Sequence, residues 1–144
     1  DVSEVALQVA RENAERNGVE VKVRRVDVLS TVNCQLSTVN SYEVVVSNPP
    51  YVCEEERKGM ERNVLEHEPE QALFVPDERP LLFYRKIALL GCSLLAEGGC
   101  LFFEINRRFG AEVVGLLEGM GYRDVELRKD QFGNDRMVKA IKPL

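Results

Sequence analysis

Five consecutive residues, Ser47-Asn48-Pro49-Pro50-Tyr51, combine groups that could hold a planar amine or amide for reaction at its nitrogen. Such a nitrogen is a poor nucleophile because its lone pair is delocalised. Two acceptors that take both N–H hydrogens can orient it toward an electrophile. The side-chain oxygen of Asn48 and the carbonyl of Pro49 can be these acceptors, since proline fixes φ and aims the backbone. Tyr51 adds a flat face for packing. The pattern predicts catalysis by positioning; a strand that merely ends in a rigid diproline turn is the alternative.

The elements around this motif favour a site at the edge of a sheet. The motif directly follows Val44-Val45-Val46, a β-branched run typical of a strand buried in a parallel sheet. The two prolines cannot continue a strand ladder, so the strand must end there. Ligands of open α/β sheets bind at the carboxyl ends of strands, which is where the motif falls.

Periodicity predicts alternating helices and strands along the rest of the chain. Helices are expected at 3–17, 81–95 and 111–120, and strands at 19–26, 42–47, 100–105, 122–128 and 136–142. Residues 31–41 are expected to form a loop, and residues 53–80 are either functional or partly helical. Gly98-Gly99 is typical of a helix C-cap. The turn at 130–135 predicts a terminal antiparallel hairpin. The order implies an α/β sheet with helices on both faces.

The composition is that of one ordinary globular domain, and it argues against nucleic acid and membrane as partners. The 144 residues are 44% hydrophobic and 30% charged, with a net charge of −5. This acidic balance argues against direct nucleic-acid binding, and no apolar run reaches the roughly 20 residues of a membrane helix. Four cysteines without CxxC spacing and one histidine predict reduced cytoplasmic thiols and no metal site. A chain that starts with Asp1 is either processed or a fragment.

The motif and its flanking segments resemble one family. Ser47-Asn48-Pro49-Pro50-Tyr51 is similar to the signature of methyltransferases that use S-adenosylmethionine to methylate amino groups, in DNA and RNA adenine or in protein glutamine. The glutamine-N5 branch that acts on peptide-chain release factors is resembled further by four segments across the chain: Val64-Leu65-Glu66-His67-Glu68-Pro69, Ala72-Leu73-Phe74, Glu104, and Asp130 with Gly133-Asn134-Asp135-Arg136. The resemblance implies an S-adenosylmethionine-dependent enzyme with a class I, Rossmann-like sheet.

The resemblance also implies which residues bind the cofactor, with S-adenosylhomocysteine as the product. Asp1 stands where the family binds the ribose hydroxyls, and Asp27 with Val28 where it contacts the adenine. A turn-capping role is the alternative for Asp27. Asn48 matches the residue that touches both cofactor and substrate.

The substrate side is implied by the same match. Asn48, Pro49 and Tyr51 would be the catalytic residues, and Pro50 would help them shape a slot for glutamine. Glu68 is similar to a residue that borders this slot. The implied partner is a release factor.

The resemblance implies a portion that this chain lacks. The glycine-rich cofactor loop, the first β-α-β portion and an N-terminal helical domain have no counterpart, so residues 1–144 would form a partial catalytic domain. We expect this chain alone to bind cofactor weakly or not at all and to be inactive. Two other functions remain open: N6-methylation of adenine in DNA or RNA, and a non-catalytic scaffold module.

Overall fold

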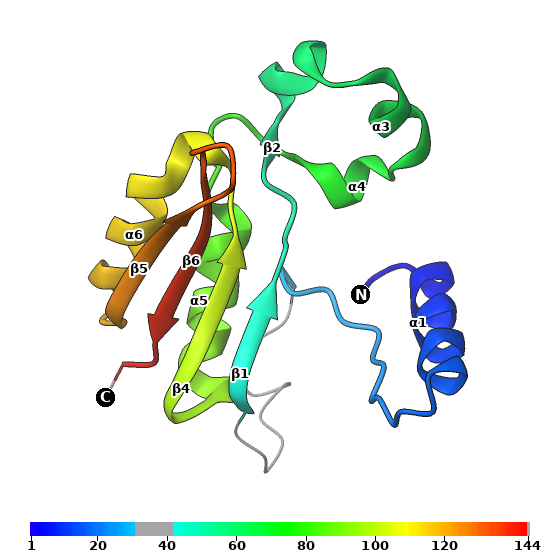
Figure 1. The fold of residues 1–144 in the computed structure, drawn as a ribbon, viewed down its shortest axis with the longest axis horizontal. Coiled ribbons are helices and arrows are strands. Elements are labelled where there is room, and N and C mark those ends of the chain that lie inside the picture. Colours follow the sequence, from blue (N-terminus) through cyan, green and yellow to red (C-terminus); the bar gives the residue numbers. More distant parts are fainter. Residues whose placement is uncertain (31–41, 144) are drawn as a thin grey trace. The chain divides into compact units, whose positions relative to one another are not determined.

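The computed structural model describes residues 1–30 and 42–143, so the loop predicted at 31–41 lies outside the described residues. The chain divides into two compact units, Asp1–Val32 and Asn33–Leu144. The first holds one helix, and the second holds the sheet that carries the Asn48 motif (Figure 1).

The first unit is built on helix α1 (Glu4–Arg16), which confirms the helix predicted at 3–17. Ser3 caps its start, with the Ser3 hydroxyl oxygen accepting from the Ala6 N–H at 3.3 Å. Gly18 follows its end at φ +63°, a conformation that glycine adopts without strain.

The strand predicted at 19–26 is wrong, because these residues form no strand in the structure. A strand needs a neighbouring strand for its ladder, and within this unit only the chain start lies alongside. The Val26 N–H donates to the Asp1 carbonyl at 3.0 Å, and the Asp1 amino group donates to the Arg24 carbonyl at 3.3 Å. These bonds nevertheless bring Asp1 close to Val26, the residue before Asp27.

The second unit is organised by a four-stranded mixed sheet in the order β1-β4-β6-β5. Strands β1 and β4 are parallel, whereas β4 pairs with β6, and β6 with β5, in antiparallel fashion. The strands span Tyr42–Ser47 (β1), Leu95–Glu104 (β4), Arg123–Lys129 (β5) and Asp135–Ile141 (β6). Each lies at or near a predicted strand.

One face of this sheet packs on helices α5 (Leu82–Leu94) and α6 (Gly110–Gly119), which lie behind it in Figure 1. Alternate residues such as Leu101 and Phe103 of β4 point into this core and are buried. The Tyr84 ring meets Phe103 edge-on, with centroids 5.2 Å apart. Full burial of each such side chain contributes about 1.5–3 kcal/mol. The α/β class and its helices are confirmed.

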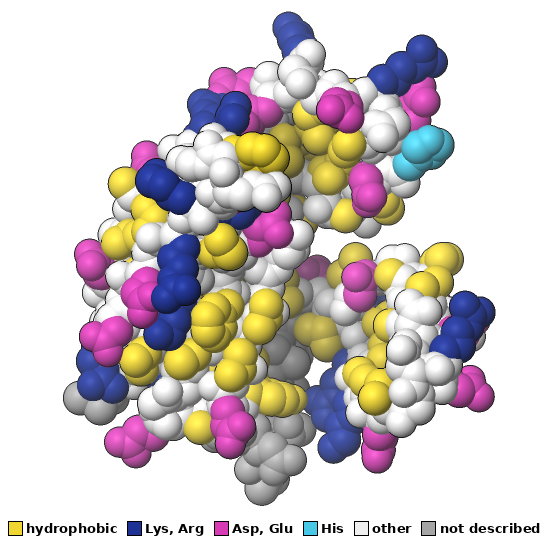
Figure 2. All heavy atoms as spheres, in the orientation of Figure 1, with side chains coloured by type: hydrophobic (Ala, Val, Ile, Leu, Met, Phe, Trp, Pro, Cys, Tyr) yellow, Lys and Arg dark blue, Asp and Glu magenta, His cyan; other side chains and the backbone are white. Residues whose placement is uncertain are grey.

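The other face of the sheet carries the intervening side chains, including Val44 and Val46 of β1, Phe102 of β4 and Met137 of β6. Figure 2 shows hydrophobic side chains gathered on this face. Val46 is 74% exposed, and none of the described helices of this unit covers these residues. A helix layer on this second face therefore stays a prediction.

The terminal hairpin is confirmed. Strands β5 and β6 pair across a turn in which the Asp130 N–H donates to the Asn134 carbonyl at 2.8 Å. Gly133 takes a φ of +82° in this turn. Gly98-Gly99, in contrast, does not cap the preceding helix. Helix α5 ends at Leu94, and Gly98 lies inside β4 at a φ of +73°, near the point where the β1–β4 register shifts.

The segment between the motif and α5 is partly helical, as one of its two predicted alternatives stated. Strands β2 and β3 pair in parallel and join its two ends. Its elements are β2 (Val52–Cys53), η1 (Glu54–Gly59), α3 (Arg62–His67), α4 (Glu70–Leu73) and β3 (Phe74–Val75). The segment thus folds back so that its end lies beside its start. A short helix η2 (Arg107–Phe109) follows β4.

Candidate active site

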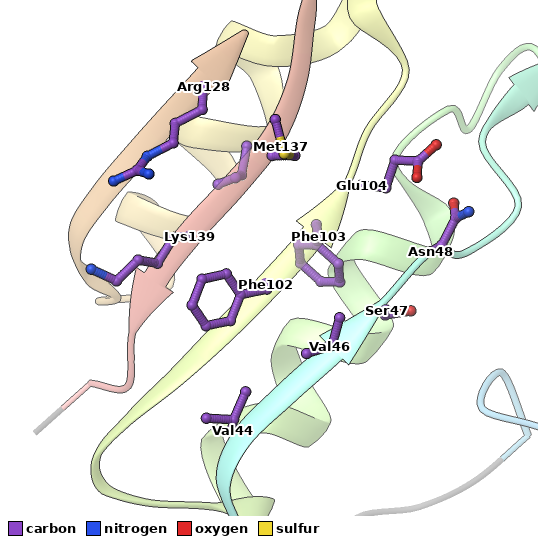
Figure 3. Close-up of a pocket in the computed structure, with 11 residues that line it drawn as sticks. Val44, Val46, Ser47, Asn48, Phe102, Phe103, Glu104, Arg128, Met137 and Lys139 are labelled. Atoms are coloured by element: carbon purple, nitrogen blue, oxygen red, sulfur yellow. The ribbon is translucent and has the colours of Figure 1, made fainter. Parts of the chain in front are cut away.

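The Asn48 motif begins where β1 ends, as predicted. Ser47 pairs with Phe103 in the parallel register, so Asn48 and Glu104 follow at the same edge of the sheet. Figure 3 shows their side chains at one end of a groove, where Asn48 follows β1 and Glu104 ends β4. Pro49 is buried and anchors the turn, whereas Asn48 is exposed. An exposed amide at the carboxyl end of a strand is available to a ligand.

Tyr51 is fixed by three hydrogen bonds that use all of its polar groups. Its hydroxyl donates to Glu104 Oε1 at 2.8 Å, and its N–H donates to the Leu73 carbonyl at 3.2 Å. Its carbonyl accepts from Asn106 Nδ2 at 3.1 Å. Three anchors from separate segments leave the ring little freedom, which suits a surface against which a planar group packs.

These anchors explain why particular segments accompany the motif. Glu104, at the end of β4, holds the Tyr51 hydroxyl. Leu73, in α4, holds the Tyr51 N–H. The Asp130 turn holds Arg136, whose Nε lies 3.4 Å from Asp130 Oδ2. The positive charge of Arg136 in turn lowers the pKa of the Tyr51 phenol, against the other effects on it.

The Tyr51 phenol stays neutral over the physiological range. Burial, then the hydrogen bond and the negative charge of Glu104, raise its pKa from 10.0 to about 12, although Arg136 opposes the shift. Tyr51 therefore offers a neutral ring and does not act as a base. Cys53, two residues on, is buried, and this burial raises the pKa of its thiol to about 11. A thiol held protonated is a poor nucleophile, so Cys53 is structural.

A groove of about 690 Å³ extends from Asn48 and Glu104 along the uncovered sheet face. Its floor is apolar, with Val46, Phe102 and Met137 among its side chains (Figure 3). The full lining comprises Val44, Val46, Ser47, Asn48, Phe102, Phe103, Glu104, Arg128, Met137, Val138 and Lys139. Polar side chains therefore lie at two places along the groove: Asn48 and Glu104 at one end, and Arg128 and Lys139 on the side formed by β5 and β6.

The structure does not join every predicted substrate residue to the motif. Glu68 is exposed and forms the C-cap of α3. Among the described residues, no hydrogen bond connects its carboxylate to the residues from Asn48 to Tyr51. Pro50 is half-buried within the motif itself. The roles of both in binding a substrate stay predictions.

The predicted cofactor residues Asp1, Asp27 and Val28 lie in the first unit. Asp1 Oδ1 accepts from the Ser3 N–H at 2.8 Å. Asp27 Oδ1 accepts from the Leu29 N–H at 2.9 Å, and its Oδ2 accepts from the Ser30 hydroxyl at 2.7 Å. Asp27 thus caps a turn, the alternative stated for it. Both carboxylates are exposed and belong to neighbouring segments. Their role in binding a cofactor, like that of Val28, stays a prediction.

Sequence reasoning missed Asn106 and Glu56. Asn106 is buried, and its Nδ2 donates to Glu56 Oε2 at 2.7 Å as well as to the Tyr51 carbonyl. A polar residue directly after a buried strand was the available signal. Glu56 carried none, because a run of three glutamates is usually a solvated face.

Within residues 1–30 and 42–143, no group of three or more acidic, histidine or cysteine side chains is arranged to hold a metal ion. Over the same part of the chain, every helix is too short or too polar to cross a bilayer.

Comparison with known proteins places this chain among methyltransferases. The family model described as "Methyltransferase small domain" matches residues 1–73, which include the Asn48 motif. A release factor glutamine methyltransferase of Bacteroides thetaiotaomicron is 52% identical over 140 residues, 97% of this chain and 49% of that protein. Its namesake in Flavobacterium psychrophilum is 45% identical over 97% of this chain and 48% of its own length. This chain thus spans about half the length of these relatives.

A solved structure supports the fold alone. The crystal structure of a methyltransferase from Pyrococcus furiosus superposes on this chain with a TM-score of 0.64 and 19% sequence identity. The match covers 100% of this chain and 61% of the Pyrococcus protein. The α/β arrangement described above is therefore a methyltransferase fold.

Proposed function

Because this chain belongs to the methyltransferase small domain family, we propose that it is part of an enzyme that methylates the side-chain amide nitrogen (N5) of a glutamine in a peptide-chain release factor. The observation that carries the proposal is the exposed Asn48 amide at the carboxyl end of β1, three residues before a Tyr51 that is fixed by three hydrogen bonds. The names of the two relatives support the substrate. Because the chain spans about half their length, the proposal concerns the intact protein.

Asn48 and Pro49 bind and orient the glutamine amide. The Asn48 side-chain oxygen and the Pro49 carbonyl each accept one N–H of the amide. The nitrogen lone pair then points toward the methyl donor, and the fixed turn supplies this alignment before the substrate arrives. Orientation of this kind lowers the barrier because the reacting groups need no further ordering.

Tyr51 packs its ring against the plane of the amide. The hydrogen bond to Glu104 holds the phenol at its far end, and the bonds to Leu73 and Asn106 hold its backbone. The neutral ring adds no charge that would compete with the acceptors. The methylated amide loses its extra proton to water, so the residues of the motif need not include a base.

S-adenosylmethionine supplies an electrophilic methyl group on sulfur, and S-adenosylhomocysteine is the product. Asp1 and Asp27 would hold the adenosine part, with Val28 and Asn48 beside it. These residues account for the adenosine part alone, so we propose that residues 1–144 by themselves bind the cofactor weakly or not at all and are inactive. Cys53, Cys92 and Cys100 are free thiols, which fits a reducing, cytoplasmic location.

The test supplies the intact protein with methyl-labelled S-adenosylmethionine and offers a release factor and a DNA duplex separately. Asn48→Ala removes the proposed acceptor. Asn63→Ala is the matched control, because Asn63 is an exposed asparagine on α3. The proposal expects label on the release factor, lost with Asn48→Ala and kept with Asn63→Ala.

Each other outcome identifies a different function. Label on the DNA duplex alone would mean that a flipped adenine occupies the site. Label on neither substrate would favour a scaffold module. Label on the release factor that survives Asn48→Ala would remove this motif from the reaction.

A further inference from the structure

Asn106 occupies an unusual position for an asparagine. It follows β4 by two residues and is 4% exposed, which makes it the one buried polar side chain among the residues that the structure describes. Buried polar groups are costly unless all their hydrogen bonds are formed. A buried asparagine this close to the Asn48 motif therefore requires an account of its contacts.

Every polar group of the Asn106 side chain has a partner. The side-chain Nδ2 donates to the Tyr51 carbonyl at 3.1 Å and to Glu56 Oε2 at 2.7 Å. The side-chain Oδ1 accepts from the Arg108 N–H at 3.0 Å and so caps η2. The Asn106 side-chain amide thus connects the chain after β4 to the Tyr51 carbonyl at the end of the motif.

Glu56 provides the second half of this connection. Its Oε2 also accepts from the Cys53 N–H at 2.9 Å, and Arg108 Nη1 lies 3.8 Å away. The carboxylate and the Tyr51 carbonyl are both acceptors, so only a donor with two hydrogens can satisfy them together. The asparagine amide has two such hydrogens, whereas an aspartate or a serine at this position has fewer.

We propose that Asn106 is a positioning residue of the methyl-transfer slot. Asn106 holds the Tyr51 carbonyl and thereby sets the direction of the preceding Pro49-Pro50 turn. This inference rests on the proposed function. Asn106 lies behind Tyr51 and acts through it, without touching the substrate. Loss of its two donors leaves Tyr51 attached by its N–H and its hydroxyl, so its peptide can rotate about these two remaining anchors.

Single variants at Asn106, Glu56 and Glu55 separate this role from a general structural one. Asn106→Ser keeps a hydroxyl that can cap η2 but is too short to reach both acceptors. Glu56→Gln retains an acceptor for Cys53 and leaves the Tyr51 carbonyl bond intact. Glu55→Gln is the matched control, since it changes an exposed side chain that pairs with Arg108 and leaves in place the Glu55 N–H that donates to Asp77 Oδ1 at 3.1 Å. Asn106→Thr, which keeps a hydroxyl that can cap η2 and fills more of the space of the asparagine, serves if Asn106→Ser does not fold.

Steady-state methylation of a release factor by the intact protein gives the main result. Asn106→Ser should lower kcat by about tenfold to a hundredfold, the range expected for a displacement of roughly 1 Å. The KM for S-adenosylmethionine should change little, and Glu56→Gln should cost much less than Asn106→Ser. Equal losses in Asn106→Ser and Glu56→Gln, or a folded Asn106→Ser with the wild-type kcat, would overturn the inference.

A second readout keeps this test separate from the proposed function. Burial and then Glu104 raise the pKa of the Tyr51 phenol to about 12; in Asn106→Ser it should titrate at a lower pH, because a loosened residue gains access to water while it keeps its bond to Glu104. An unchanged Tyr51 titration would contradict the positioning role even if the wild-type protein methylated neither substrate. If the wild type is inactive but the titration shifts, the proposed function fails and the positioning of Tyr51 by Asn106 stands.

Discussion

The hydrogen bond between Tyr51 and Glu104 makes a quantitative prediction about the stability of the site. Tyr51→Phe removes the hydroxyl that donates to Glu104 Oε1 at 2.8 Å and leaves the ring in place. A hydrogen bond to a charged group contributes about 1.5–3 kcal/mol when it is shielded from water. Because Tyr51 is only half-buried, water replaces part of the lost bond. We therefore expect the free energy of unfolding to fall by roughly 1–1.5 kcal/mol.

Urea denaturation of the intact protein, followed by circular dichroism, measures this change. Glu104→Gln and the double variant Tyr51→Phe/Glu104→Gln complete a double-mutant cycle. Directly bonded side chains show a coupling free energy of about 0.5–3 kcal/mol, and about 1 kcal/mol is expected here. Equal urea slopes for the four proteins would show that the unfolded states are comparable.

The reasoning would be refuted by additivity. If the double variant lost the sum of the two single losses, the Tyr51 hydroxyl and the Glu104 carboxylate would act independently. If Tyr51→Phe alone changed the free energy of unfolding by less than about 0.5 kcal/mol, it would behave as an ordinary surface substitution. The hydrogen bond from the Tyr51 hydroxyl to Glu104 would then contribute nothing measurable to stability.

Three further perturbations follow from the same geometry. Phe103→Ala, at a ring 2% exposed, should cost about 3–5 kcal/mol in urea denaturation, whereas its matched control Phe132→Ala, at a ring 79% exposed, should stay within about 0.5 kcal/mol. An added Cβ at Gly91 would lie 2.5 Å from the Tyr122 hydroxyl oxygen, so Tyr122→Phe should partly rescue the melting temperature of Gly91→Ala, and strictly additive losses would contradict that contact. The pKa of Tyr51 is raised from 10.0 to about 12 in the folded state, so its proton favours folding below pH 10.0 and this contribution is lost as the pH rises to about 12; wild type and Tyr51→Phe should converge in stability across that window.

The sequence predicted the sheet well because its signals are local. The Val44–Val46 run and the diproline that ends it fix one strand, and the turn at Gly133 fixes the hairpin. The strand at 19–26 was mispredicted for a non-local reason. Alternating residues indicate only that a segment can pair, and within the described residues of the first unit the backbone bonds of this segment to the chain start form no strand ladder.

The residues of the candidate site likewise divide into those with a local sequence signal and those without one. Asn48 and Tyr51 were identifiable because their types and spacing already imply a chemistry. Asn106 and Glu56 were not, since their role depends on hydrogen bonds between residues 50 or more positions apart. Glu68 shows the opposite case, in which a family-like residue has no described hydrogen bond to the motif. Long-range polar contacts are the information that periodicity and composition do not contain.

The most direct test of the central claim is mass spectrometry of a release factor incubated with the intact protein and S-adenosylmethionine. The account predicts one added methyl group on the side-chain amide of a glutamine, absent when Asn48→Ala replaces the wild type and present with Asn63→Ala. A release factor that gains no methyl group, or one that gains it equally from Asn48→Ala, would contradict the assignment of this motif as the methyl-transfer site.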